Sequence, residues 1–156
     1  MIKRPRELPE AEYITPTKEG LERRYKEYNE KYFEGVLSPC RMSLSQSKSG
    51  YGLYINGTAK SKPIIYICKY AWWTEETLEL VIVHEMVHHY VESIIKPKYF
   101  TLPHGCTFNR VCRKIKRKHG IDVRMFKIKN PYFYKEKIPT TFLGKLWRKL
   151  NFIMAI

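Results

Sequence analysis

Residues 84–88 read His-Glu-Met-Val-His and lie in the most hydrophobic stretch of a strongly basic chain. Four residues correspond to about 400° of rotation on an α-helix, so His84 and His88 project from one face, one turn apart. Two neutral imidazoles at this spacing can bind one zinc ion, and Glu85, about 100° around the helix, can reach a water molecule at the metal. Zinc lowers the pKa of that water, and the carboxylate takes its proton as it attacks a carbonyl carbon. The motif is typical of metallopeptidases.

The same residues have a simpler explanation as part of a protein core. A match of this kind arises by chance in roughly one chain of this length in a few hundred. A histidine on an apolar helix face is also more often a hydrogen-bonded core residue than a metal ligand. However, two histidines and a glutamate would all have to be buried and satisfied in one apolar helix, which is costly without a metal. We therefore favour zinc binding over simple burial.

The residues around the motif predict a buried helix between Thr74 and Pro97. Thr74 precedes Glu75 and Glu76, which is typical of an N-cap followed by acidic residues at the positive end of a helix dipole. From Leu78 onward, apolar residues leave little polar surface before Pro97. A helix that is apolar on nearly every side belongs at the centre of a domain. A metal site on it would be held rigidly and away from bulk water.

A zinc peptidase needs a third protein ligand and leaves the fourth position to water. His89 points about 100° away from His88. His119 precedes a glycine at a predicted helix C-terminus, where the helix dipole alone favours an imidazolium. His104 lies just before a new helical pattern that includes Phe108, and it could merely cap that helix. Since it is the remaining histidine free to approach the first pair, we favour His104 as the third ligand of one zinc ion per chain.

Other zinc-peptidase arrangements disagree with the spacing. The metzincin motif would need Gly at position 91 and His at position 94, where this chain has Val91 and Ile94. A thermolysin-like site takes its third ligand from a glutamate on a later helix. Glu92 is too close to the motif, and the later acids Asp122 and Glu136 lie in no convincing helical pattern. Elimination therefore also favours a histidine as the third ligand.

These motifs resemble the SprT-like metalloprotease family, which includes Spartan. After a spacer, the motif at 84–88 is followed by His104-Gly105 and Phe108, and residues 28–38 are similar to the opening helix of the family and its aromatic-x-Gly-x-Leu exit. The resemblance extends over roughly residues 15–130.

The resemblance implies a zinc peptidase with Glu85 as the catalytic base and a protein or peptide as substrate. It implies three zinc ligands: His84, His88 and His104. It also suggests a role at DNA, because Spartan-type members degrade proteins that are crosslinked to DNA. Many relatives carry a Cys-rich zinc ribbon after the protease domain, and this chain has none.

The pattern along the chain predicts an α+β fold of zincin-like type, with a small β-sheet packed against the central helix that carries the motif. Residues 1–16 are predicted to be a loose arm, 17–130 the protease domain and 131–156 a C-terminal extension. Tyrosines at helical spacing between residues 21 and 33 predict a helix with an aromatic core face, ended by Gly35. Strands are expected at 41–45, 51–55 and 64–68.

Composition indicates polyanionic partners and a reducing compartment. The formal charge of +14 favours DNA and other polyanions. The four cysteines form no Cys-x-x-Cys pair, so a Cys-based zinc site is not expected. The N-terminus resembles no signal peptide, and no stretch approaches the ~20 apolar residues of a membrane span. We therefore expect a cytoplasmic, nucleoid or nuclear protein that is neither secreted nor integral to a membrane.

Two basic regions follow the predicted site. The helix after His104 carries cations away from its apolar stripe, and four of them are candidate DNA contacts: Arg113, Lys114, Arg117 and Lys118. The simpler explanation is an ordinary solvated face, although such faces usually mix charge signs. Residues 141–156 form a basic amphipathic pattern that could contact a membrane surface, although packing onto the domain is the commoner outcome.

The sequence thus predicts a zinc-dependent metalloendopeptidase that cleaves DNA-associated or DNA-crosslinked proteins. The alternative is a basic nucleic-acid-binding module with a structural zinc ion. A structural site usually closes with four protein ligands, often cysteines, and has no use for a carboxylate such as Glu85 beside the ion.

Overall fold

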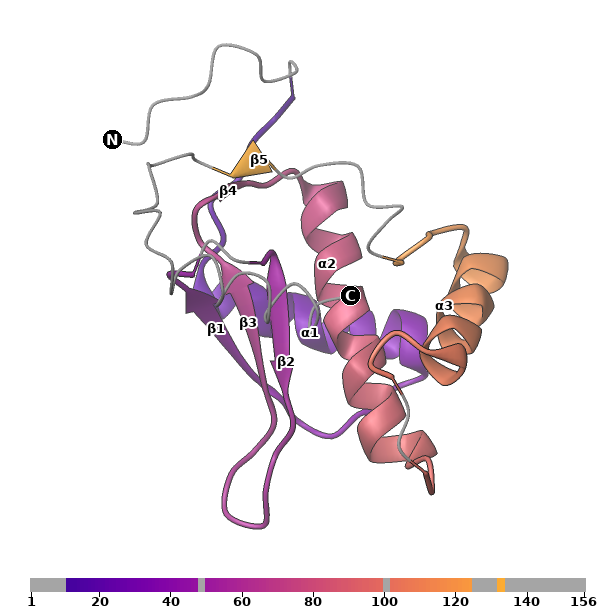
Figure 1. Ribbon diagram of the computed structural model, residues 1–156. Coiled ribbons are helices and arrows are strands. Elements are labelled where there is room, and N and C mark those ends of the chain that lie inside the picture. The colour runs from indigo at the N-terminus through magenta and orange to yellow at the C-terminus, as the bar shows by residue number, and fades with distance from the viewer. Residues whose placement is uncertain (1–10, 48–49, 100–101, 125–131, 134–156) are drawn as a thin grey trace, which may run out of the picture.

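The computed structural model describes residues 11–47, 50–99, 102–124 and 132–133 (Figure 1). The elements in chain order are α1 (Lys18–Phe33), β1 (Arg41–Ser45), β2 (Gly52–Ile55), β3 (Ile64–Cys68), β4 (Ala71–Trp72), α2 (Glu75–Tyr90), the π-helix η1 (Val91–Ile95), α3 (Cys106–His119) and β5 (Tyr132–Phe133). The predicted α+β architecture is confirmed. The predicted amphipathic segment 141–156 and residues 1–10 of the predicted arm lie outside the described residues.

The main sheet has the strand order β1-β3-β2, so β1 and β2 are its edges. β1 runs parallel to β3, with Met42 opposite Ile65, and β2 runs antiparallel to β3, with Tyr54 opposite Ile65. The side chains of Met42, Ile65 and Ile67 are buried on one face of this sheet. Leu53 of β2 points to the opposite face and is 55% exposed, as expected for a strand that alternates between a core face and solvent.

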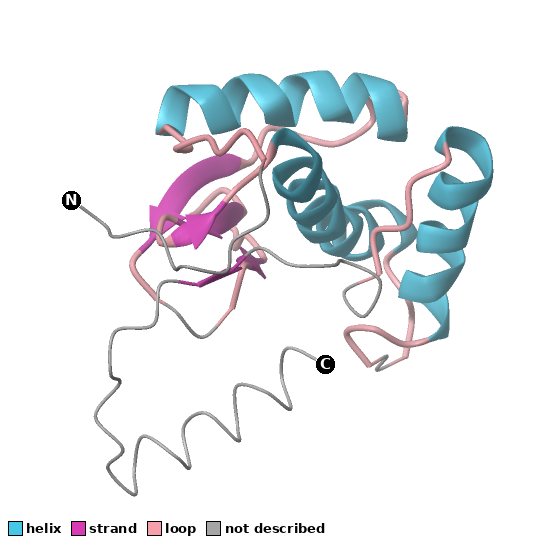
Figure 2. Ribbon diagram, turned by 90° about the horizontal axis from the view of Figure 1, so that it is seen from above, coloured by secondary structure: helices cyan, strands magenta, loops and turns pink. Residues whose placement is uncertain are grey.

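Helix α2 lies at the centre of the domain. It contacts α1, β2, β3 and α3, and Figure 2, which views it nearly end on, shows α1, the sheet and α3 around it. The predicted N-cap is confirmed: the Thr74 hydroxyl accepts from the Thr77 backbone N–H at 3.2 Å, and the Thr77 hydroxyl in turn accepts from the Thr74 N–H at 3.0 Å. The helix continues into η1, which ends at Lys96 in the left-handed region.

The other two helices are held by their apolar faces. The predicted aromatic stripe of α1 is buried and belongs to the core. Helix α1 ends at Phe33 with Glu34 as its C-cap, and the predicted terminating Gly35 follows it; Glu34 and Gly35 both take positive φ. Helix α3 buries Phe108, Val111, Cys112 and Ile115 and ends at Gly120, whose φ of 80° suits glycine. Among the residues that the structure describes, no helix combines the length and hydrophobicity needed to span a bilayer.

Candidate metal centre

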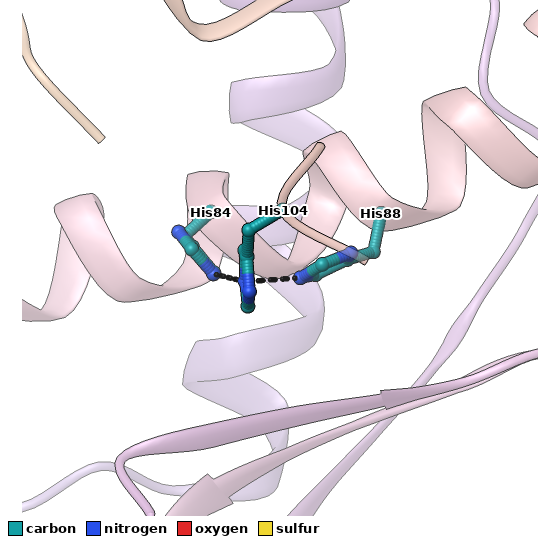
Figure 3. A group of neighbouring side chains, drawn as sticks. All are labelled: His84, His88 and His104. Atoms are coloured by element: carbon teal, nitrogen blue, oxygen red, sulfur yellow. Dashed lines mark hydrogen bonds between the residues drawn. The ribbon is translucent and has the colours of Figure 1, made fainter. Parts of the chain in front are cut away.

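The structure brings three of the predicted site residues together. His84 and His88 project from one face of α2, and His104 reaches them from the loop before α3 (Figure 3). The Nε2 atom of His104 lies 3.0 Å from Nε2 of His84 and 3.1 Å from Nε2 of His88. Within the described ranges, these three residues form a group whose ligand atoms lie within 4.8 Å of one another. This convergence is the defining feature of the site.

The hydrogen bonds of the rings favour a shared cation. Nδ1 of His84 lies 2.7 Å from the carbonyl oxygen of Val123, so Nδ1 carries the proton and Nε2 presents a lone pair to the other rings. A carbonyl partner of this kind is typical of a zinc-ligating histidine. Around a tetrahedral zinc ion with bonds of about 2.0–2.1 Å, ligand nitrogens lie about 3.3 Å apart. The two separations that involve His104 are close to that value, and all three ligand atoms lie within 4.8 Å of one another, so the donor set suits zinc.

Burial keeps the imidazoles of His84 and His88 in the neutral form that binds metals. His84 is only 2% exposed, and burial lowers its pKa to about 3 despite the bond to Val123. Burial also lowers the pKa of His88, and the neighbouring His84 and His104 lower it further. The Phe108 ring lies 4.5–4.9 Å from all three imidazole centroids and forms an apolar wall beside them. Two neutral, desolvated imidazoles on α2 therefore face the ring of His104 across a short gap.

His104 is positioned by the first turn of α3. The Asn109 side chain donates to the carbonyl oxygen of His104 at 2.6 Å and to that of Gly105 at 3.1 Å, which ties the loop to the helix. Nδ1 of His104 is buried, and the described residues offer it no hydrogen-bond partner. The histidine therefore does not act as a side-chain cap, since the N-cap of α3 is Gly105 and makes no such bond. Asn109 lies in the first turn of the helix predicted after His104, but the sequence alone does not show that its side chain contacts this loop.

Glu85 lies on the side of α2 that faces the sheet. It is 5% exposed, and burial raises its pKa to about 8, while a hydrogen bond from the Tyr54 backbone opposes that rise. Strand β2 approaches so closely that a Cβ atom on Gly52 would lie 2.6 Å from Oε1 of Glu85. Sequence reasoning missed both β2 residues. A glycine inside a predicted strand is the one signal that could have suggested such a close approach.

The two remaining histidines lie outside the three-histidine group, in agreement with the spacing argument. His89 is 1% exposed and lies against α1 and the segment after it, with Nδ1 3.0 Å from the Tyr25 hydroxyl. His119 is in the last turn of α3, as predicted, and packs edge-on against the Tyr32 ring at 4.9 Å.

Three of the four candidate DNA contacts line one hollow. A concavity of about 450 Å³ on the side of α3 has these lining residues: Tyr90, Ile95, Arg110, Val111, Arg113, Lys114 and Arg117. The fourth candidate, Lys118, instead pairs with Glu34 at 2.8 Å. Arg110, which belongs to the same basic face of the helix but was not among the four candidates, completes a lining that includes four cations and no acid.

Fold and site together define an α+β domain whose central helix presents two histidines of a three-histidine group that could hold a metal ion. The model of the SprT-like family matches residues 21–129, so the chain belongs to the SprT-like family and contains a metallopeptidase-like domain. The resemblance noted from the sequence motifs is thereby confirmed. No curated protein matches the chain significantly.

Proposed function

We propose that the protein is a zinc-dependent endopeptidase in which His84, His88 and His104 hold the metal and Glu85 is the catalytic base. The convergence of three imidazoles, two of them on the same helix as a buried carboxyl group, carries this proposal. Three ligands leave room for water and substrate in the fourth position. Zinc would supply Lewis acidity to the scissile carbonyl group and lower the pKa of the attacking water.

Glu85 is suited to move a proton in this reaction. Burial raises its pKa above that of an exposed glutamate, and a neighbouring zinc ion would favour the carboxylate form that a base needs. With its proton affinity set between these two influences, the group could take a proton from the attacking water and give it to the leaving amine. Because the side chain is buried between α2 and β2, bulk water has little access to it.

Strand β2 offers a place for an extended substrate. It is an edge strand, and it is the edge that lies against α2. A peptide added as a further strand would run past Glu85, since Gly52 and the Tyr54 backbone contact this carboxylate. Main-chain pairing of this kind tolerates many side chains, which suits a peptidase that acts on varied protein targets.

The test is the Glu85→Gln variant. Zinc content and the circular dichroism spectrum should match those of the parent, while cleavage of a peptide or protein substrate should be lost, because an amide cannot accept the proton. The matched control is Glu92→Gln, which changes an exposed acid two turns further along and should keep full activity. Peptidase activity that persists in purified Glu85→Gln would contradict the assigned base. If the parent itself cleaves nothing, with or without DNA, a structural zinc site becomes the better explanation.

We further propose that DNA is the partner that presents protein substrates, either in the cytoplasm or at the nucleoid or nucleus. The hollow on α3 supports this: its cations suit phosphates, and Tyr90 and Ile95 provide an apolar floor for a base. Tyr90 lies about 200° around α2 from His88, so the hollow and the metal centre use opposite sides of that helix. Bound DNA would thus leave the peptide site free.

A salt series tests the DNA proposal. Replacing Arg113, Lys114 and Arg117 by Glu should weaken binding of single-stranded DNA and flatten its salt dependence, because fewer counterions are released. Zinc content and cleavage of a short peptide should stay at parental levels. Lys118→Glu is the matched control, since Lys118 is already paired with Glu34. Unchanged affinity and slope in the triple variant would mean that this is only a solvated face. Loss of binding to anionic vesicles but not to DNA would point to a membrane surface instead.

A further inference from the structure

Helix α2 carries a second pair of polar residues at i,i+4 spacing. Glu85 and His89 are each one position after the metal-centre histidines, so they project about 100° away from His84 and His88. Both are almost fully buried, at 5% and 1% exposure. The metal-centre pair faces His104, whereas this second pair faces strand β2.

Tyr54 of β2 is held by both members of this pair. Its ring stacks on the imidazole of His89, with centroids 5.5 Å apart and planes inclined by 23°. Its backbone hydrogen bonds to the carboxyl group of Glu85. Side chain and main chain of one residue therefore connect the two positions on α2. Gly52, two residues earlier on the same face of the strand, allows the carboxylate to lie against the backbone.

The imidazole of His89 is itself fixed in one orientation. The Tyr25 hydroxyl donates to the carbonyl oxygen of Ser38 at 2.8 Å, so its oxygen is left to accept a hydrogen bond from Nδ1–H of His89 at 3.0 Å. Nε2 of His89 is then the acceptor and faces the Ser38 hydroxyl at 3.4 Å. The Tyr25 ring also stacks on His89, with centroids 6.3 Å apart.

An apolar residue could fill the same space but could not satisfy these groups. Without His89, the Tyr25 oxygen and the Ser38 hydroxyl would each lose a buried partner, and nothing would orient the surface on which Tyr54 stacks. Through His89, β2 is therefore held in place by contacts with α1 and the segment after it, as well as by contacts with α2.

We propose that His89 and Tyr54 are positioning residues that hold edge strand β2 against Glu85 and so fix the carboxylate at the metal centre. This inference rests on the proposed catalytic role of Glu85. Neither residue contacts reacting atoms through its side chain. Their effect is to keep the backbone of Tyr54 within hydrogen-bonding distance of the carboxylate, where a small displacement costs catalytic rate.

Hydrogen exchange of the Tyr54 backbone amide directly tests whether His89 and Tyr54 clamp strand β2 against Glu85, and it needs no peptidase activity. In the full-length zinc-loaded protein, His89→Leu should speed exchange at Tyr54 by about tenfold or more, while amides in the middle of α2 keep their protection. Tyr54→Leu should have the same effect at that position. Tyr54→Phe keeps the ring and should restore the slow exchange. Tyr66→Leu, on the neighbouring strand and opposite sheet face, is the matched control and should leave Tyr54 protected.

Kinetics then separates positioning from general destabilisation. In His89→Leu, kcat for a short peptide should fall by about tenfold to a hundredfold with zinc affinity unchanged. The double variant with Tyr54→Leu should be no worse than either single one, because both remove one contact. Parental exchange and parental kcat in His89→Leu would overturn the proposal. So would loss of protection throughout α2, and if that variant does not fold, Tyr54→Leu decides. If the parent has no activity, the proposed function fails, whereas the clamp is still judged by exchange at Tyr54.

Discussion

Helices α2 and α3 both supply polar side chains to proposed sites, but under opposite physical conditions. The polar groups of α2 at the site, such as His84 and Glu85, are buried among apolar neighbours and would be costly without partners. The cations of α3 lie on its exposed side, where water satisfies them. A buried polar group therefore requires an explanation, whereas an exposed charge requires none. This difference makes the metal centre a stronger inference than the DNA face.

Among the changes that test this difference between α2 and α3, loss of a metal ligand should have the largest effect on zinc binding and stability. We expect His104→Ala to lower zinc affinity by orders of magnitude and to abolish the rise in Tm that zinc gives the parent, because a ligand that binds only the folded state stabilises it. Zinc analysis after dialysis against a chelator and thermal melts with added zinc measure both effects.

Cys106 provides the control for that experiment. It is an exposed free thiol two residues after His104, at the start of α3. Cys106→Ala should keep zinc as tightly as the parent. If instead Cys106→Ala loses zinc and His104→Ala keeps it, the third ligand is the Cys106 thiolate. The site would then consist of two histidines of α2 and one cysteine.

The next effect concerns pH in the zinc-free protein. Burial lowers the pKa of His84, His88 and His89, that of His89 to about 4, so between pH 6.5 and 4 the unfolded chain binds more protons than the folded one. Stability should therefore fall as the pH drops through that window. The raised pKa of Glu85, about 8 against 4.5 unfolded, has the opposite sign. Stability should thus also decline from about pH 6.5 to 8, by at most about 1.4 kcal/mol per pH unit.

Urea unfolding at a series of pH values, with zinc removed, measures this dependence of the unfolding free energy on pH. The optimum is expected near pH 6.5, because below that pH the three histidines outweigh the opposing effect of Glu85, whereas above it only the effect of Glu85 remains. A curve that rises steadily toward pH 8 would mean that Glu85 is ionised in the folded protein. A buried, ionised Glu85 on α2 would then need a further partner for its carboxylate.

A smaller effect is expected at the start of α2. Thr74→Ala removes the hydroxyl that accepts from the Thr77 backbone N–H and also bonds to the Thr77 hydroxyl, and it should cost about 1 kcal/mol of unfolding free energy. Thr17→Ala, at the N-cap of α1, removes a single side-chain bond to the Gly20 backbone and should cost less. Denaturant midpoints of the two variants provide the comparison. Equal losses would show that the reciprocal bond adds nothing to the position of the central helix.

The sequence predicted best the features that depend on local geometry. The N-cap follows from a threonine placed directly before two acidic residues. The face shared by His84 and His88 and the direction of His89 away from them follow from about 100° of rotation per residue. Strand positions were also predicted, since apolar runs between turn residues indicate them. Each of these needs only neighbours within a few positions along the chain.

Features that depend on long-range packing could not be predicted. Val123, the acceptor for His84, is 39 residues away, and nothing in its own surroundings indicates that contact. Strand order is equally hidden, so the sequence did not identify β2 as the edge beside Glu85. The switch from α2 to the π-helix η1 has no signal that we can identify. Lys118 was grouped with its neighbours by helix spacing, and only the fold shows that it pairs with Glu34.

The smallest effect is expected on the exposed side of α3. Arg113 and Lys114 each have cations three or four residues away, including Arg110 and Arg117. Like charges at this spacing destabilise a helix by about 0.2–0.5 kcal/mol per pair. The double variant Arg113→Gln and Lys114→Gln should therefore be slightly more stable than the parent, and more clearly so at low salt. Lys118→Gln, in contrast, removes the ion pair with Glu34 and a favourable charge in the last turn, and should be slightly less stable.

Urea unfolding of both variants at low and high salt measures these small shifts. A gain in the double variant would mean that α3 retains its cations at some expense to its own stability, which is understandable if they bind a polyanion. A loss would mean that Arg113 or Lys114 has a stabilising partner in the fold. The charges of α3 would then need a structural explanation, as the polar groups of α2 do, and the case for DNA at this face would weaken accordingly.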